Sequence, residues 1–131
     1  MRLIWYVALG GAVGSVARYL LTSAIQARTG SAFPLGTLLI NISGSIVLGF
    51  LLRYALETPS VSPDMRALLA TGLCGGYTTF SAFSYETAAL IQDGDWKRAG
   101  LYVGLSVAGA LIGTFAGFAG ARELLVLRRA L

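Results

Sequence analysis

The run at residues 72–84, Gly-Leu-Cys-Gly-Gly-Tyr-Thr-Thr-Phe-Ser-Ala-Phe-Ser, places adjacent glycines and several hydroxyl side chains inside an apolar segment. Glycine weakens a helix, so Gly75 and Gly76 predict an interruption that leaves backbone groups without helical partners. Hydrocarbon cannot satisfy such groups, and an interrupted helix is tolerated only where it is buried in protein or lines a cavity. We therefore expect a ligand here, most naturally an ion.

Polar side chains also recur at a spacing of four in two other apolar segments. Thr37, Asn41 and Ser45 share one helical face, and Tyr102, Ser106 and Thr114 share another, with Ala110 at the vacant step. In a membrane the amide of Asn41 must find partners, and the spacing leaves two interpretations open. It either joins two helices by a hydrogen bond or donates to a ligand in a pathway.

The composition is that of a membrane protein. Of the 131 residues, 56% are hydrophobic and 12% are charged, and the mean hydropathy is +0.72. Apolar stretches predict four spans, at about residues 3–25, 35–56, 66–91 and 98–121, within a single membrane domain at residues 1–131. The expected fold class is an all-α membrane protein whose third transmembrane helix is broken at residues 75–79. We interpret the first stretch as a span and not as a signal peptide.

The titratable residues argue against catalysis. The sequence contains no histidine and one cysteine, Cys74, so an intramolecular disulfide and the usual metal or proton-shuttle ligand are both excluded. We find no nucleophile–base pair, phosphate-binding loop or metal-ligand spacing, and therefore expect no enzyme. The only acidic residue inside the predicted spans is Glu86, which we place near a membrane interface. A single carboxylate without histidine is a poor proton relay.

The basic residues lie at the span ends and not on a soluble face, so we expect no nucleic-acid partner. Apart from the C-terminal arginines, the two sides carry equal numbers: Arg2, Arg53 and Arg66 against Arg28, Lys97 and Arg98. This balance allows insertion in either orientation. Arg18 lies inside the first span and either reaches the interface or supplies positive charge to a vestibule that attracts anions.

Small residues at a spacing of four predict close helix packing. They occur as Gly10 with Gly14, as Ser45 with Gly49, and as Gly109, Gly113 and Gly117. Four short helices are few to surround a polar pathway, so a homo-oligomer is expected.

Three motifs resemble those of the Fluc/CrcB family of fluoride channels. The most specific is Gly-Gly-Tyr-Thr-Thr-Phe-Ser-Ala-Phe-Ser at residues 75–84; the others are Gly-Thr-Leu-Leu-Ile-Asn at 36–41 and Gly-Gly-Ala-Val-Gly-Ser-Val-Ala-Arg-Tyr at 10–19. The resemblance covers essentially the whole chain. One departure is Ala110, where some members are expected to carry another hydroxyl.

The resemblance implies a fluoride-selective channel that exports cytoplasmic fluoride passively through the cell inner (plasma) membrane. It implies an antiparallel, dual-topology homodimer with two pores and a central structural sodium ion. Backbone carbonyls of Gly75 and Thr78 from both subunits would bind that ion, as suits a hard cation that prefers oxygen ligands.

The resemblance also assigns the anion pathway. Fluoride is small and strongly hydrated, so many donors must replace its water shell. The amide of Asn41 and the hydroxyls of Thr37, Ser81, Ser84, Tyr102 and Ser106 would donate, and Phe80 and Phe83 would present positive ring edges. Arg18 would provide vestibule charge.

Two other functions remain open. A small dual-topology four-helix multidrug/proton antiporter should carry a carboxylate in the first span, and residues 3–25 contain none. A non-transporting membrane assembly subunit would need the glycine spacing but no polar track.

Overall fold

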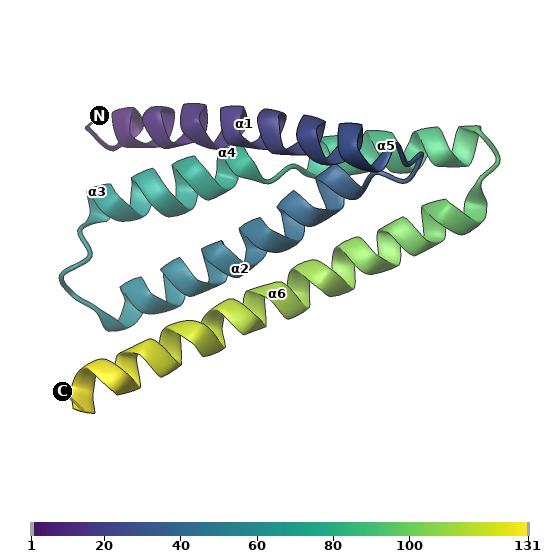
Figure 1. Ribbon diagram of the computed structural model, residues 1–131. Coiled ribbons are helices and arrows are strands. Elements are labelled where there is room, and N and C mark those ends of the chain that lie inside the picture. Colours follow the sequence, from purple (N-terminus) through teal and green to yellow (C-terminus); the bar gives the residue numbers. More distant parts are fainter. Residues whose placement is uncertain (1, 131) are drawn as a thin grey trace.

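The computed structural model describes residues 2–130, and every regular element in this part of the chain is a helix. The elements are α1 (Arg2–Thr29), α2 (Leu35–Glu57), α3 (Pro63–Arg66), the π-helix η1 (Ala67–Cys74), α4 (Gly75–Tyr77), α5 (Phe80–Gln92) and α6 (Trp96–Ala130). Segments α3, η1 and α4 follow one another directly, and α5 resumes after an interruption (Figure 1). The chain is thus four helical segments, of which the third is broken.

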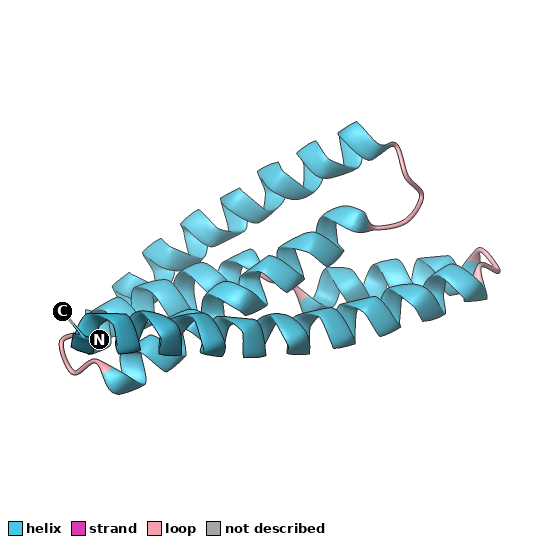
Figure 2. Cartoon of the chain, turned by 60° about the horizontal axis from the view of Figure 1, so that its bottom comes forward, coloured by secondary structure: helices cyan, strands magenta, loops and turns pink. Residues whose placement is uncertain are grey.

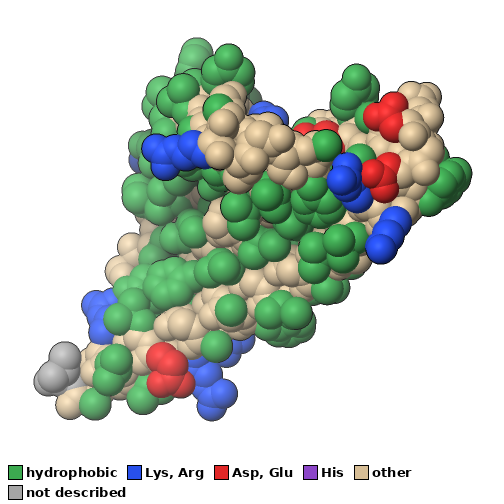
Figure 3. Space-filling view, turned by 45° about the vertical axis from the view of Figure 1, so that its right-hand side comes forward, with side chains coloured by type: hydrophobic (Ala, Val, Ile, Leu, Met, Phe, Trp, Pro, Cys, Tyr) green, Lys and Arg blue, Asp and Glu red, His purple; other side chains and the backbone are tan. Residues whose placement is uncertain are grey.

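The all-helical membrane architecture predicted from composition is confirmed. Helices α1, α2 and α6 are each long and apolar enough to cross a bilayer, and the fourth expected crossing is divided by the break. Both termini lie at the same end of the molecule in two views (Figures 1 and 2). Hydrophobic side chains cover much of the visible surface, and charged ones gather toward its ends (Figure 3). The exterior therefore suits a lipid bilayer.

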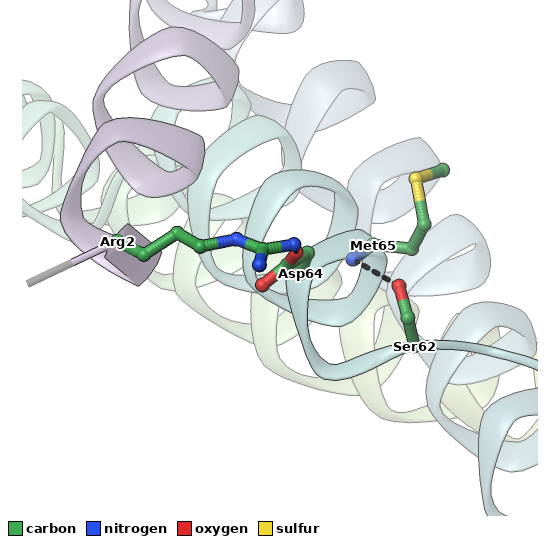
Figure 4. Close-up of polar contacts among 4 residues, drawn as sticks. All are labelled: Arg2, Ser62, Asp64 and Met65. Carbon is green, nitrogen blue, oxygen red and sulfur yellow. Dashed lines mark hydrogen bonds and ion pairs between the residues drawn. The ribbon is translucent and has the colours of Figure 1, made fainter.

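Local sequence signals set the helix ends. Gly30 and Gly94, with φ of 56° and 78°, occupy the left-handed region directly after α1 and in the turn before α6. The Ser62 side chain accepts a hydrogen bond from the Met65 amide and caps α3, whose first residue is Pro63 (Figure 4). Beside this cap, Arg2 forms an ion pair with Asp64 and ties the start of α1 to the third segment (Figure 4).

Glycines allow two helix pairs to pack backbone against backbone. A Cβ added to Gly14 of α1 would lie 2.8 Å from the Tyr77 amide nitrogen, and one added to Gly117 of α6 would lie 2.6 Å from that of Phe50 in α2. These distances leave no room for a side chain. The close packing predicted from the glycine spacing therefore occurs within one chain, between α1 and the η1–α4 segment and between α2 and α6.

The break is shorter than predicted and lies further along the chain. Gly75 and Gly76 remain helical, and only Thr78 (φ −87°, ψ 159°) and Thr79 (φ −152°, ψ 119°) are extended. The prediction of unwound glycines was wrong because a glycine permits unwinding without requiring it. Gly76 serves packing instead, since an added Cβ would lie 2.5 Å from the Gly11 carbonyl oxygen.

Candidate functional site

The break removes hydrogen bonds from the carbonyls that precede it. In a continuous helix, the carbonyls of residues 75–78 would accept from the amides of residues 79–82. Here the Thr79 amide donates instead to Asn41 Oδ1 at 2.8 Å, and the Ala82 amide donates to Thr79 Oγ1 at 3.2 Å. The end of α4 therefore presents carbonyl oxygens whose helical partners are gone.

Asn41 of α2 binds the break from one side. Its Oδ1 accepts from the Thr79 amide, and its Nδ2 donates to the Thr79 carbonyl at 3.0 Å. Asn41 thus forms the interhelical hydrogen bond that was the first of its two interpretations from the sequence. A primary amide has two N–H groups, and only one is used by Thr79. Because Asn41 also lines a cavity, the second N–H remains available to a ligand.

Arg18 and Ser15 of α1 bind the break from the other side. Arg18 Nε donates to the Gly76 carbonyl oxygen at 3.0 Å, and Ser15 Oγ lies 3.5 Å from the same oxygen. Within residues 2–130, the carbonyls of Gly75, Tyr77 and Thr78 have no such donor. One of the freed carbonyls is therefore capped by a cation, while its neighbours remain open.

A first cavity of about 280 Å³ lies between α2, the break, α5 and α6. It is lined by Asn41, Ser45, Leu48, Thr78, Thr79, Phe80, Phe83, Ser106, Val107 and Ala110. The Ser106 hydroxyl is buried and has no hydrogen-bond partner in the described chain. Leaving a buried hydroxyl unpaired costs free energy, and such a group is satisfied by a ligand or by water.

Two phenylalanines border this cavity. The rings of Phe80 and Phe83 are 5.5 Å apart, and Phe83 lies 5.3 Å from the ring of Tyr102. Phe83 is partly buried, whereas Phe80 is 79% exposed and forms the rim. The cavity wall thus combines aromatic rings with hydroxyl and amide donors.

A second cavity of about 290 Å³ lies between α1, α2 and α5. It is lined by Ser15, Arg18, Tyr19, Thr22, Ser23, Thr37, Thr79, Ala82 and Glu86. Its lining is richer in polar side chains than that of the first cavity, and it contains one cation and one carboxylate. Thr79 lines both cavities, so the two polar spaces meet at the break.

Glu86 joins two of the predicted pathway residues. The Thr37 hydroxyl donates to Glu86 Oε1 at 2.7 Å, and the fully buried Tyr102 hydroxyl donates to Oε2 at 2.6 Å. From the sequence we placed Glu86 near a membrane interface and assigned it no role. A signal was present, because Glu86 follows Phe83 by three residues and so shares its helical face.

The predicted pathway and vestibule residues fall into four groups. Asn41, Phe80, Phe83 and Ser106 line the first cavity, and Arg18 and Thr37 line the second. Tyr102 meets Thr37 at Glu86.

Ser81 and Ser84 line neither cavity. Both are exposed; Ser84 Oγ donates to the Phe80 carbonyl at 3.0 Å, and Ser81 Oγ lies 3.2 Å from Thr79 Oγ1.

These features define a multi-pass membrane protein whose polar groups converge on a discontinuous helix, an arrangement typical of transport proteins. The family model described as "CrcB-like protein, Camphor Resistance (CrcB)" matches residues 5–118, and the chain belongs to this family. The resemblance inferred from the three motifs is confirmed.

Curated relatives cover nearly the whole chain. The "Fluoride-specific ion channel FluC" of Geobacter sulfurreducens is 48% identical over 124 residues, which are 95% of this chain and 100% of that protein. The protein of the same name from Flavobacterium psychrophilum is 45% identical over 124 residues, with the same coverage. The one from Aquifex aeolicus is 43% identical over 119 residues, 90% of this chain and 95% of that protein.

Proposed function

We propose that this protein is a fluoride-selective channel that exports cytoplasmic fluoride passively across the inner (plasma) membrane. Full-length relatives carry the name fluoride-specific ion channel, a class of protein without catalytic activity. The observation that carries the proposal is the Ser106 hydroxyl, buried and unpartnered in a cavity shared with Asn41 and Phe83. A small anion that accepts hydrogen bonds satisfies this group.

The chemistry of the first cavity suits a dehydrated anion. Ser106 offers an O–H and Asn41 a second N–H, while the phenylalanine rings offer electropositive edges. Helix α5 begins at this cavity, and the N-terminus of a helix carries partial positive charge. Donors, ring edges and helix end thus converge without placing a full positive charge there, which would hold the anion too tightly to conduct.

The remaining pathway residues extend the route in both directions. The hydroxyls of Thr37 and Tyr102 donate to Glu86, and each rotates to serve a passing fluoride and then returns to the carboxylate. Ser81 and Ser84 lie at the exposed mouth. Arg18 uses Nε for the Gly76 carbonyl, and the rest of its guanidinium supplies positive charge to the second cavity as a vestibule.

The proposed assembly is an antiparallel homodimer with two pores. Support comes from the equal basic charge of the two sides apart from the C-terminal arginines, which allows both orientations. Further support comes from Phe80, which is 79% exposed although its ring borders the proposed pathway. A second copy would cover this rim and close the route to lipid.

A sodium ion is proposed at the dimer centre, held by the carbonyls of Gly75 and Thr78 from both subunits. The fit is supported by two observations. These carbonyls have no donor within residues 2–130, and a Cβ added to Gly75 would meet nothing within 4 Å. Oxygen ligands on an open backbone suit a hard cation, which would occupy the free lone pairs of these carbonyls and join the breaks of the two subunits.

The other functions fit less well. A multidrug/proton antiporter would need a membrane carboxylate in α1, and α1 contains no acidic residue. A non-transporting assembly subunit would have no use for an unpartnered buried hydroxyl in a polar cavity.

Fluoride efflux from liposomes that contain only this purified chain tests the proposal. We expect efflux that is lost in Ser106→Ala and retained in Thr87→Val. The Thr87 hydroxyl is a matched control because it already donates to the Phe83 carbonyl at 2.7 Å. Absence of efflux from a dimeric wild-type protein contradicts the proposed function.

A further inference from the structure

We propose that Arg18 is a positioning residue: its Nε–H caps the Gly76 carbonyl and thereby fixes the shape of the helix break. This role is separate from any vestibule charge. It rests on the proposed function for its effect on conduction, but not for its geometry.

The packing of α1 places Arg18 at the break. A Cβ added to Gly14 would lie 2.8 Å from the Tyr77 amide nitrogen, and one added to Gly76 would lie 2.5 Å from the Gly11 carbonyl oxygen, so neither glycine has room for a side chain. Arg18 follows Gly14 by one helical turn on the same face, so its side chain reaches over the end of α4. The resulting Nε–O distance of 3.0 Å is that of a good hydrogen bond.

The Gly76 carbonyl needs this donor. Its helical partner would be the Phe80 amide, which the extended Thr78 and Thr79 carry away. The C-terminal end of a helix carries partial negative charge, and unpaired carbonyls at membrane depth are costly. A charge-assisted hydrogen bond from a guanidinium pairs the carbonyl and also offsets the partial negative charge of the helix end.

The cap matters because the break is held from two sides. Asn41 fixes Thr79 after the interruption, and Arg18 fixes Gly76 before it. With both anchors present, the intervening carbonyls have defined directions. Without Arg18, the Gly76 carbonyl keeps only a long contact from Ser15 Oγ, and the open carbonyls and the cavity wall at Thr78 and Thr79 lose one of their two anchors.

Side-chain chemistry separates the cap from the charge. In glutamine, Nε2 is as many bonds from Cα as Nε is in arginine, so Arg18→Gln keeps a donor at the same place and removes the charge. Arg18→Met keeps a similar length and removes both. The cap therefore predicts that glutamine substitutes for Arg18 wherever charge is screened, and that methionine does not.

The test is fluoride efflux from liposomes at two ionic strengths, with wild type, Arg18→Gln, Arg18→Met and the control Arg28→Gln, which removes an exposed arginine at the far end of α1. At about 1 M salt, where exposed charge is screened most, we expect Arg18→Gln to conduct at least about tenfold faster than Arg18→Met. The reason is that Arg18→Met leaves the Gly76 carbonyl with only the 3.5 Å contact from Ser15 Oγ, which is too long for a good hydrogen bond.

Equal rates for Arg18→Gln and Arg18→Met at high salt, whether both normal or both slow, overturn the cap. A loss in Arg18→Gln that appears only at low salt reports the vestibule charge and leaves the cap standing. Melting temperatures provide a readout that does not need conduction: Arg18→Gln should melt above Arg18→Met, and the reverse order or equality counts against the cap. If wild type itself does not conduct, the proposed function fails while this melting order still decides the cap.

Discussion

Asn41 binds both backbone polar groups of Thr79, with Oδ1 accepting from its amide at 2.8 Å and Nδ2 donating to its carbonyl at 3.0 Å. An extended residue in a membrane helix has no backbone partner of its own, and here one side chain from a neighbouring helix supplies both. The same side chain lines the first cavity. Asn41 therefore couples the shape of the break to the wall of the proposed pathway.

This coupling predicts different results for two substitutions of Asn41. Asn41→Asp keeps an acceptor for the Thr79 amide but loses the donor and adds negative charge beside the pathway. It should still purify as a folded protein, yet fluoride efflux should fall by at least about tenfold because the anion is repelled. Asn41→Leu removes both bonds and should also lower the free energy of unfolding by about 1–3 kcal/mol.

Efflux and chemical denaturation together separate these effects. Normal efflux in Asn41→Asp would show that this amide only joins helices. Thr87→Val is a suitable control, because Thr87 lines neither cavity, its Oγ1 donates to the Phe83 carbonyl in its own helix, and its loss leaves Thr79 paired.

The aromatic pair gives a second prediction. Phe80→Ile and Phe83→Ile keep much of the apolar volume but remove the electropositive ring edge. If these rings serve only packing, each change should lower stability by under about 1.5 kcal/mol and leave efflux near normal. If they border the pathway as proposed, efflux should collapse in a protein that remains dimeric. A dimeric double variant that conducts normally would remove the ring edges from the mechanism.

Dual topology gives a third prediction. Both termini lie at the same end of the molecule, so a C-terminal tag reports the orientation of the whole protein (Figure 2). Because the loop charges are balanced, the tag should be accessible from both faces of the membrane. Labelling of intact and permeabilised cells measures the two fractions. A single orientation in every molecule would rule out the antiparallel dimer.

Much of the fold was predictable because hydropathy and helix-breaking residues depend only on the local sequence. The apolar stretches and the interruption in the third segment were both visible along the chain. The position of the break was missed, since it depends on Asn41 competing for the Thr79 amide, a contact between residues far apart in sequence.

The site was only partly predictable for the same reason. A spacing of four identified the polar faces of Thr37 and Tyr102 but could not show that they converge on Glu86. Likewise, the position of Arg18 within α1 gave two interpretations, and neither was the hydrogen bond to Gly76. Helical period fixes which residues share a face, whereas tertiary packing fixes what that face meets.

The two glycines before the break give a fourth prediction, because they are equivalent in sequence and different in space. A Cβ on Gly76 would lie 2.5 Å from the Gly11 carbonyl, whereas a Cβ on Gly75 would meet nothing within 4 Å of its own chain. Gly76→Ala should therefore disrupt the packing of α1 on α4 and destabilise the single chain by about 1–3 kcal/mol through overpacking. Gly75→Ala should leave the isolated chain at least as stable as wild type, because Gly75 is helical and alanine has the higher helix propensity.

The dimer and sodium proposals add a further expectation for Gly75. If the open face at Gly75 meets the partner's break around a cation, Gly75→Leu should shift the protein from dimer to monomer and abolish any dependence of its melting temperature on sodium. Size-exclusion chromatography with light scattering, and melting in sodium against a large organic cation, measure both effects. A Gly75→Leu protein that remains dimeric, with wild-type sodium dependence, would place the subunit interface and the cation elsewhere.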